Sequence, residues 1–144
     1  MGQSELDKVK DAANKAINSK VANFRKEYDS KMGQHKQIAE KLERLKNAKR
    51  LADREMSELN SFKSKVNREI KKTSTGSFKG TRRQKFEQTS EQIIKAVNSQ
   101  HDKNQDEIDA LNRKISKLEF EESSVGGAMA EISATIGGLM AMLK

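Results

Sequence analysis

The feature that most constrains the fold is an apolar repeat in which steps of four and three residues alternate. From Ile17 to Ile70 this alternation visits sixteen positions, and twelve of them hold an apolar or aromatic residue. Hydrophobic residues make up only 33% of the chain, so composition alone does not produce this enrichment. Such a repeat places one apolar stripe along an α-helix, whereas a β-strand needs a period of two. The first half of the chain is therefore predicted to be a long amphipathic helix.

The second half carries a stripe of the same kind. Its positions are Ile94, Val97, His101, Asn104, Ile108, Leu111, Ile115, Leu118, Glu122, Val125, Met129, Ile132, Ile136, Leu139 and Leu143. The chain contains no proline, the residue that most strongly stops a helix. Two helices with one stripe each bury their apolar residues by folding back on each other. The sequence therefore predicts an all-α fold, a single long antiparallel helical hairpin with coiled-coil packing over residues 1–144.

The expected boundaries follow from the break between the stripes. We predict a first arm over 1–72, a turn over 73–81 and a second arm over 82–144. Gly33 weakens the first arm by about 1 kcal/mol relative to alanine, and a bend is expected near it. If the turn is centred near Gly76, Leu143 pairs with Val9 and the two arms match in length. Leu6, Val9, Ala13 and Ala16 continue the first stripe toward its N-terminal end.

A lone hairpin of this length has a thin core, because conformational entropy nearly cancels its hydrophobic gain. We therefore expect a second copy or a different helical protein to cover the remaining apolar surface. The residues predicted to bury that interface are Ile108, Leu111, Ile115, Leu118, Val125, Met129, Ile132, Ile136 and Leu139. Lys31, Lys49 and Lys63 interrupt the first stripe. Lysine at such positions either selects register and partner or extends its ammonium group into solvent.

The break itself reads "GSFKGTRRQKF" from Gly76 to Phe86. Its glycines supply the backbone freedom of a turn, and Phe78 is expected to pack back onto the helix ends. Much of the chain's net charge of +8 gathers here, with nine basic residues and one acid between Lys63 and Lys85. This basic tip comprises Lys63, Lys65, Arg68, Lys71, Lys72, Lys79, Arg82, Arg83 and Lys85. It is a solvated tip, a contact for an acidic partner or, with few aromatic residues to stack on bases, a nucleic-acid contact.

Phe78-Lys79-Gly80, lying between two amphipathic stretches and followed by Phe86, resembles the W-x-G turn of the WXG superfamily. The stretch from Phe78 to Glu119 is similar to a subgroup of small helical proteins encoded beside LXG toxins of Gram-positive bacteria. The resemblance covers roughly residues 28–143. It implies a WXG-like hairpin whose turn is fixed by Phe78, Gly80 and Phe86.

The resemblance also implies a function, that of an accessory targeting factor or chaperone. Such a protein binds the helical LXG domain of a toxin and helps deliver it for export by a type VIIb secretion system. Phe78 replaces the usual tryptophan, and no aromatic-x-x-x-acid export motif occurs. A second small helical accessory protein, or a surface formed in the complex, is expected to supply that signal. The implied location is the cytoplasm of a Gram-positive bacterium, with export alongside the cargo left open.

Little in the sequence indicates catalysis or a cofactor. The chain has no cysteine, and His35 and His101 are too far apart on the hairpin to share a metal ion. We expect no enzyme activity, no cofactor and no small-molecule substrate. The alternatives are a structural coiled-coil homodimer and a basic hairpin that binds nucleic acid.

The last arm ends in an apolar stretch, residues 125–143, that is rich in glycine and alanine. Small residues let another backbone approach closely, so this stretch is the favoured partner-binding element. Its length also suits a membrane anchor, although four glycines and Glu131 make it a poor one.

Overall fold

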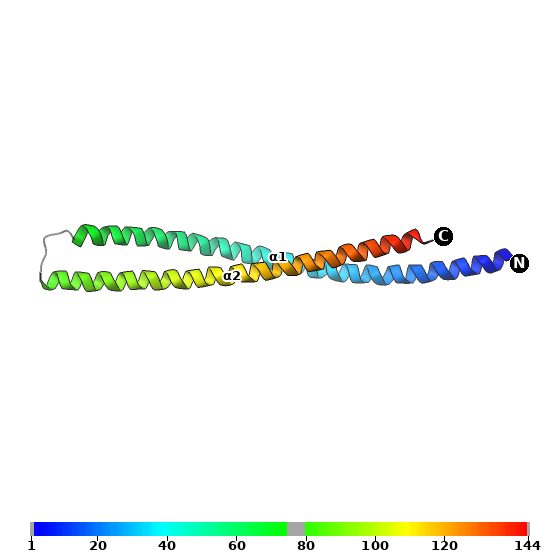
Figure 1. Ribbon diagram of the computed structural model, residues 1–144, viewed down its shortest axis with the longest axis horizontal. Helices are drawn as coiled ribbons and strands as arrows, with labels where there is room; N and C mark the ends of the chain where they lie inside the picture. Colours follow the sequence, from blue (N-terminus) through cyan, green and yellow to red (C-terminus); the bar gives the residue numbers. More distant parts are fainter. Residues whose placement is uncertain (1, 75–79, 144) are drawn as a thin grey trace. The chain divides into compact units, whose positions relative to one another are not determined.

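The computed structural model describes residues 2–74 and 80–143, with side chains from residue 5 to 73 and from 80 to 143. It contains two helices, α1 (Gly2–Ser74) and α2 (Thr81–Ala141), and none of the described residues lies in a strand. The chain divides into two compact units. Unit 1 combines Met1–Glu43 with Ser116–Lys144, and unit 2 is Arg44–Ile115. In each unit a segment of α1 lies antiparallel to a segment of α2, which confirms the predicted helical hairpin (Figure 1).

The predicted stripes form the contact between the helices in each unit, and we call their residues the seam. All sixteen seam positions from Ile17 to Ile70, and all fifteen from Ile94 to Leu143, are buried or half-buried. The most buried apolar side chains of the described residues are Val21, Leu42, Met56, Val97, Ile108 and Ile115, each no more than 8% exposed. The heptad spacing therefore predicted the buried positions correctly, and the core is one side chain wide, as expected for two helices.

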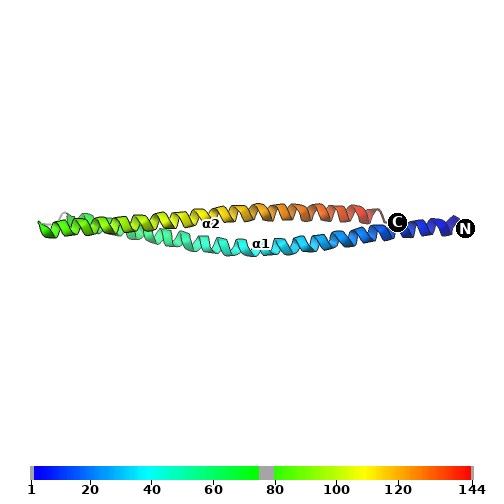
Figure 2. The same ribbon diagram turned by 90° about the horizontal axis from the view of Figure 1, so that it is seen from below.

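The predicted register is wrong. In unit 1, the guanidinium of Arg25 lies 3.8 Å from the sulfur of Met140, so the end of α2 lies beside residues near 22, not beside Val9. Leu6 and Val9 are 62% and 67% exposed, because α1 extends past the end of α2 (Figure 2). The arms thus differ in length. α1 spans 73 residues, from Gly2 to Ser74, whereas α2 spans 61, from Thr81 to Ala141.

Gly80 and Gly33 differ in backbone conformation: Gly80 has a positive φ, whereas Gly33 is helical. Gly80 precedes the first residue of α2 with a φ of 77°, a backbone region that side chains with a Cβ rarely adopt. Its carbonyl accepts a hydrogen bond from the backbone N–H of Gln84 at 3.1 Å. Gly33 lies inside α1, which runs through it without interruption, and a Cβ there would meet no atom within 4 Å.

Alanine at these two positions is expected to have opposite effects on stability. Gly80→Ala lowers the free energy of unfolding by about 1 kcal/mol, because alanine is strained at a positive φ. Gly33→Ala raises it by about 1 kcal/mol, because alanine is the better helix former and its methyl group enters open space. Urea unfolding followed by circular dichroism measures both. Equal effects of the two substitutions would contradict the assigned backbone conformations.

Candidate functional site

Unit 2 has two different surfaces beside its seam. Phe86, which is half-buried, and Ser90, which is buried, continue the seam of α2 toward the turn. We call the residues one position after each seam residue the polar face. They are Lys46, Arg50, Asp53, Ser57, Asn60, Ser64, Asn67 and Lys71 on α1, and Glu87, Glu91, Lys95, Asn98, Asp102, Gln105, Asp109 and Asn112 on α2. Every one of these positions holds a polar or charged residue. Covering a surface of this composition would contribute little favourable free energy, because it would bury polar and charged side chains instead of apolar ones.

The residues one position before each seam residue form the opposite surface, which we call the groove face. They are Arg44, Ala48, Leu51, Glu55, Glu58, Phe62, Lys65 and Glu69 on α1, and Lys85, Thr89, Ile93, Ala96, Gln100, Lys103, Glu107, Ala110 and Lys114 on α2. Leu51, Phe62 and Ile93 are 58%, 52% and 38% exposed. In an antiparallel pair of helices, corresponding flanks lie on the same side, so these residues share one surface.

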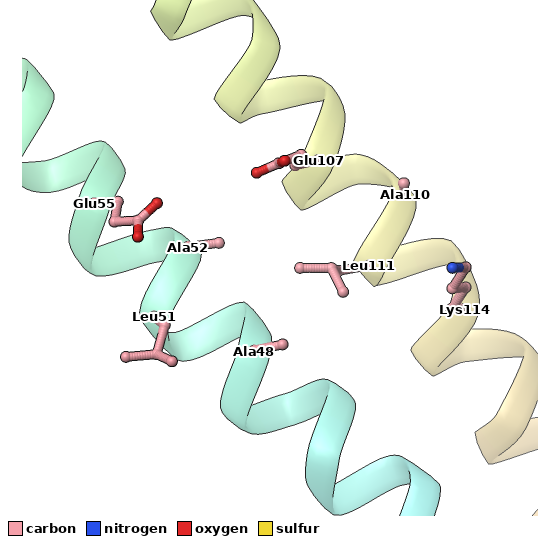
Figure 3. Close-up of a pocket in the computed structure, with 8 residues that line it drawn as sticks. All are labelled: Ala48, Leu51, Ala52, Glu55, Glu107, Ala110, Leu111 and Lys114. Atoms are coloured by element: carbon pink, nitrogen blue, oxygen red, sulfur yellow. The ribbon is translucent and has the colours of Figure 1, made fainter.

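Two open grooves on this face confirm that the flanks of α1 and α2 meet there. The first has a volume of about 440 Å³ and is lined by Ala48, Leu51, Ala52 and Glu55 of α1 and by Glu107, Ala110, Leu111 and Lys114 of α2. Figure 3 shows the side chains of Ala52 and Leu111 pointing toward one another across it. The carboxylate of Glu107 extends toward α1, while Leu51 points away from α2. The floor of the groove is therefore seam, and its walls are groove-face residues.

The second groove lies at the turn end of unit 2, with a volume of about 370 Å³. Its lining is mostly apolar and aromatic: Phe62, Val66, Ile70, Phe86 and Ile93, with Lys65, Glu69, Thr73, Thr89 and Ser90 around them. Phe86, predicted as part of the turn motif, is half-buried here against the end of α1. Phe78 lies outside the described residues.

The basic tip surrounds this end of unit 2. Lys63 is half-buried on the seam, and Lys65, Arg68, Lys71, Lys72, Arg82, Arg83 and Lys85 are exposed. Lys79 lies outside the described residues. The guanidinium of Arg83 lies 3.2 Å from the carboxylate of Glu87, one turn along α2. With both side chains about half exposed or more, this ion pair contributes little to stability.

The residues predicted as a partner interface lie on the seam and face α1. Ile108 and Ile115 are among the most buried side chains, and Leu111 is half-buried. The remaining predicted residues, Leu118, Val125, Met129, Ile132, Ile136 and Leu139, are half-buried in unit 1. Their apolar surface is used largely within the hairpin.

Unit 1 has an uncharged row on α2 one position after the seam. It consists of Ser123, Gly126, Ala130, Ser133, Gly137 and Met140. Met140 is 46% exposed, and a Cβ added at Gly126 or Gly137 would meet no atom within 4 Å. The same holds for Gly127 and Gly138. Nothing in the described chain occupies the space that these glycines leave open.

The described residues offer few side chains that could bind a metal ion and few apolar segments that could enter a membrane. His35 and His101 are half-buried seam residues that belong to different units. Among residues 2–74 and 80–143, no group of three acidic or histidine side chains converges on a point where a metal ion could sit. Over the same residues, neither helix has a segment apolar and long enough to span a bilayer.

No protein-family model, no curated protein and no solved structure matches this chain.

Sequence reasoning missed the groove face. The signal was present, since Leu51 and Phe62 lie eleven residues apart, one position before the seam, and Ile93 has the corresponding position on α2. Comparing the two flanks of the seam would have found it, because one flank holds all the apolar residues and the other none.

Proposed function

We propose that this protein is a non-catalytic accessory factor that binds a helical segment of another protein through unit 1. The proposed partner is the helical LXG domain of a toxin, delivered for export by a type VIIb secretion system. The factor acts in the bacterial cytoplasm, with a second small helical protein in the same complex. The observation that carries the proposal is the exposed apolar stripe at the N-terminal end of α1.

This stripe is a seam without an opposing helix. Leu6 and Val9 are exposed because α2 ends at Ala141, beside residues far along α1. Burial of a leucine or valine side chain contributes about 1.5–3 kcal/mol. A partner helix that lies on this stripe in line with α2 would gain that free energy without disturbing the hairpin.

The uncharged row of α2 is a second reason to place the binding region in unit 1. Each glycine inside a helix costs about 1 kcal/mol relative to alanine. The four glycines between Gly126 and Gly138 have no neighbour in the described chain that requires them. A close backbone approach by a partner helix would give them a role, as small residues do at helix–helix contacts.

Binding to an LXG domain is tested by co-expressing this chain with the helical LXG domain of a type VIIb-secreted toxin. We expect a complex that stays together in gel filtration and is measurable by titration calorimetry. Leu6→Ser with Val9→Ser should weaken binding at least about tenfold, because the lost burial exceeds 1.4 kcal/mol.

The matched control is Lys10→Ser with Asp11→Ser, which changes exposed residues of the same turns that lie off the stripe. It should bind like the wild type. If the wild-type chain forms no complex with the domain, the proposed function is wrong. If both double variants bind equally well, the partner contacts a different surface.

A further inference from the structure

We infer that the side of α1 that faces away from α2 in unit 2 binds the phosphate backbone of a nucleic-acid duplex. This goes beyond the proposed function, because the proposed LXG contact lies in unit 1. The two surfaces share no residue, and each can be tested without the other.

The binding surface is a row of eight residues along α1. The row begins two positions after the seam residue Leu45 and continues in alternating steps of three and four residues, which keep it on the side of the helix away from the seam. We call it the basic stripe: Asn47, Arg50, Arg54, Ser57, Ser61, Ser64, Arg68 and Lys71. All of these residues are exposed. With a rise of 1.5 Å per residue, the stripe is about 36 Å long.

The charge on the basic stripe has one sign. Its positions hold four basic residues, three serines and one asparagine, with no acidic and no apolar residue among them. On the two rows that border the stripe, the charged residues are Lys46, Lys65 and Lys72 against Asp53 and Glu58. The borders are therefore positive on balance as well. A shallow hollow lined by Ser57, Glu58, Ser61, Phe62 and Lys65 shows that the stripe and its border form one continuous surface.

The corresponding row of α2 has a different charge. Its residues are exposed too, and they are Gln92, Lys95, Ser99, Asp102, Asp106, Asp109 and Arg113. Three of these are acidic and two are basic. An exposed row of this hairpin therefore does not need to be basic to remain solvated, and the fold alone does not explain the charge on α1.

The composition of the basic stripe argues against a protein or a lipid surface as its partner. Protein interfaces have an apolar or aromatic core, and helices that lie on a membrane bury an apolar face in it. The stripe has no apolar residue to bury in either setting. Any partner must therefore gain its binding free energy from charge and hydrogen bonds.

A duplex backbone provides both kinds of contact. It carries about one negative charge per 1.7 Å of its axis, and cations that bind it release condensed counterions. Serine and asparagine side chains, together with arginine and lysine, commonly donate hydrogen bonds to phosphate oxygens. The stripe has Arg50 and Arg54 toward one end and Arg68 and Lys71 toward the other, with the serines between them. Since it contains no aromatic side chain to stack on unpaired bases, a duplex fits it better than a single strand does.

Fluorescence anisotropy tests the contact, with labelled DNA and RNA duplexes of about two helical turns titrated with the full chain. We expect a dissociation constant in the micromolar range or lower at about 50 mM salt. Binding should weaken about 100-fold to 1,000-fold between about 50 and 200 mM salt, the dependence expected of four to six phosphate contacts. Binding of either duplex supports the inference, and a chain that binds neither at about 50 mM salt refutes it.

Charge-removing variants test the position of the contact. Arg50→Gln with Arg54→Gln should weaken binding at least about tenfold at about 100 mM salt and lower the salt dependence by about two phosphate contacts. Arg68→Gln with Lys71→Gln should have the same effect at the other end of the stripe. Circular dichroism should show that the helices are kept, because all four side chains are exposed and glutamine favours helices.

The matched control is Lys95→Gln with Lys103→Gln, which removes the same charge from exposed positions of α2 in unit 2. It should bind within about threefold of the wild type. A control that binds as weakly as the stripe variants would mean that the duplex responds only to net charge. Full affinity of the Arg50 and Arg54 variant would restrict the contact to the basic tip. Either result would overturn the assigned surface.

Flotation with vesicles of phosphatidylglycerol and phosphatidylcholine, in the presence of an equal concentration of duplex phosphate, tests the lipid alternative. We expect the chain to stay with the duplex. If the chain floats with the vesicles and Arg50→Gln with Arg54→Gln abolishes the flotation, the stripe binds lipid phosphates and the inference is wrong. Leu6→Ser with Val9→Ser should bind the duplex like the wild type, so failure of the LXG contact and failure of this contact are told apart.

Discussion

Replacing Ile108 with aspartate is expected to unfold unit 2. Ile108 is 7% exposed and belongs to the six most buried apolar side chains of the described residues. A carboxylate placed there loses its hydration without gaining a partner, which costs several kcal/mol in addition to the lost apolar burial. Domains are stable by only about 5–15 kcal/mol in total, and a core one side chain wide has no second layer to compensate. Circular dichroism at neutral pH should show most of the helical signal of unit 2 lost.

The control for this substitution is Asn112→Asp, one turn further along α2. Asn112 is exposed on the polar face, and it gains the same charge with no desolvation. Its midpoint in urea should stay close to that of the wild type. An Ile108→Asp chain as helical and as stable as Asn112→Asp would contradict the placement of Ile108 between the helices.

The buried positions could be predicted because they depend on one short-range property. An α-helix repeats every 3.6 residues, so any residue that recurs every three or four positions faces the same side. That is why Val21 and Leu42 could be assigned to the core from spacing alone, although they lie far apart in sequence. Polar members of the seam such as Lys49 followed the same rule and are half-buried too.

The register could not be predicted in the same way, because it depends on where each helix ends. The break contains two glycines, and spacing alone does not tell which of them terminates the turn. In the structure Gly80, with its positive φ, directly precedes α2. In unit 1 the end of α2 lies beside residues near 22, which leaves Val9 exposed instead of paired.

The interface prediction shows a different limit of sequence reasoning. Residues such as Ile115 and Ile132 were expected to bind a partner because they are apolar, but a stripe cannot serve two surfaces fully at once. The seam residues are used for the contact between α1 and α2. The surfaces that remain for other proteins are the flanks of the seam and the N-terminal end of α1, which extends past the end of α2. The resemblance to LXG-associated proteins remains a prediction that the complex with an LXG domain tests.

Replacing the four glycines Gly126, Gly127, Gly137 and Gly138 with alanine is expected to stabilise unit 1 strongly. Each exchange removes about 1 kcal/mol of helix-propensity cost, so the free energy of unfolding should rise by about 4 kcal/mol. No added methyl group meets an atom of the described chain within 4 Å, so no steric term opposes the gain. The midpoint of urea unfolding, followed by circular dichroism, measures the effect. Ala130→Gly, in the same row, should lower stability by about 1 kcal/mol.

The same variant separates the structural role of these glycines from their role in binding. If a partner helix approaches α2 closely along this row, the new methyl groups at positions 126 and 137 hold the two backbones apart, and affinity for the LXG domain should fall at least about tenfold. Ala130→Gly should bind like the wild type, because it enlarges the space instead of filling it. A more stable quadruple variant that keeps full affinity would mean that the partner contacts only the N-terminal stripe of α1. Stability and affinity moving in opposite directions would show that α2 gives up helix stability to let a partner helix approach its backbone.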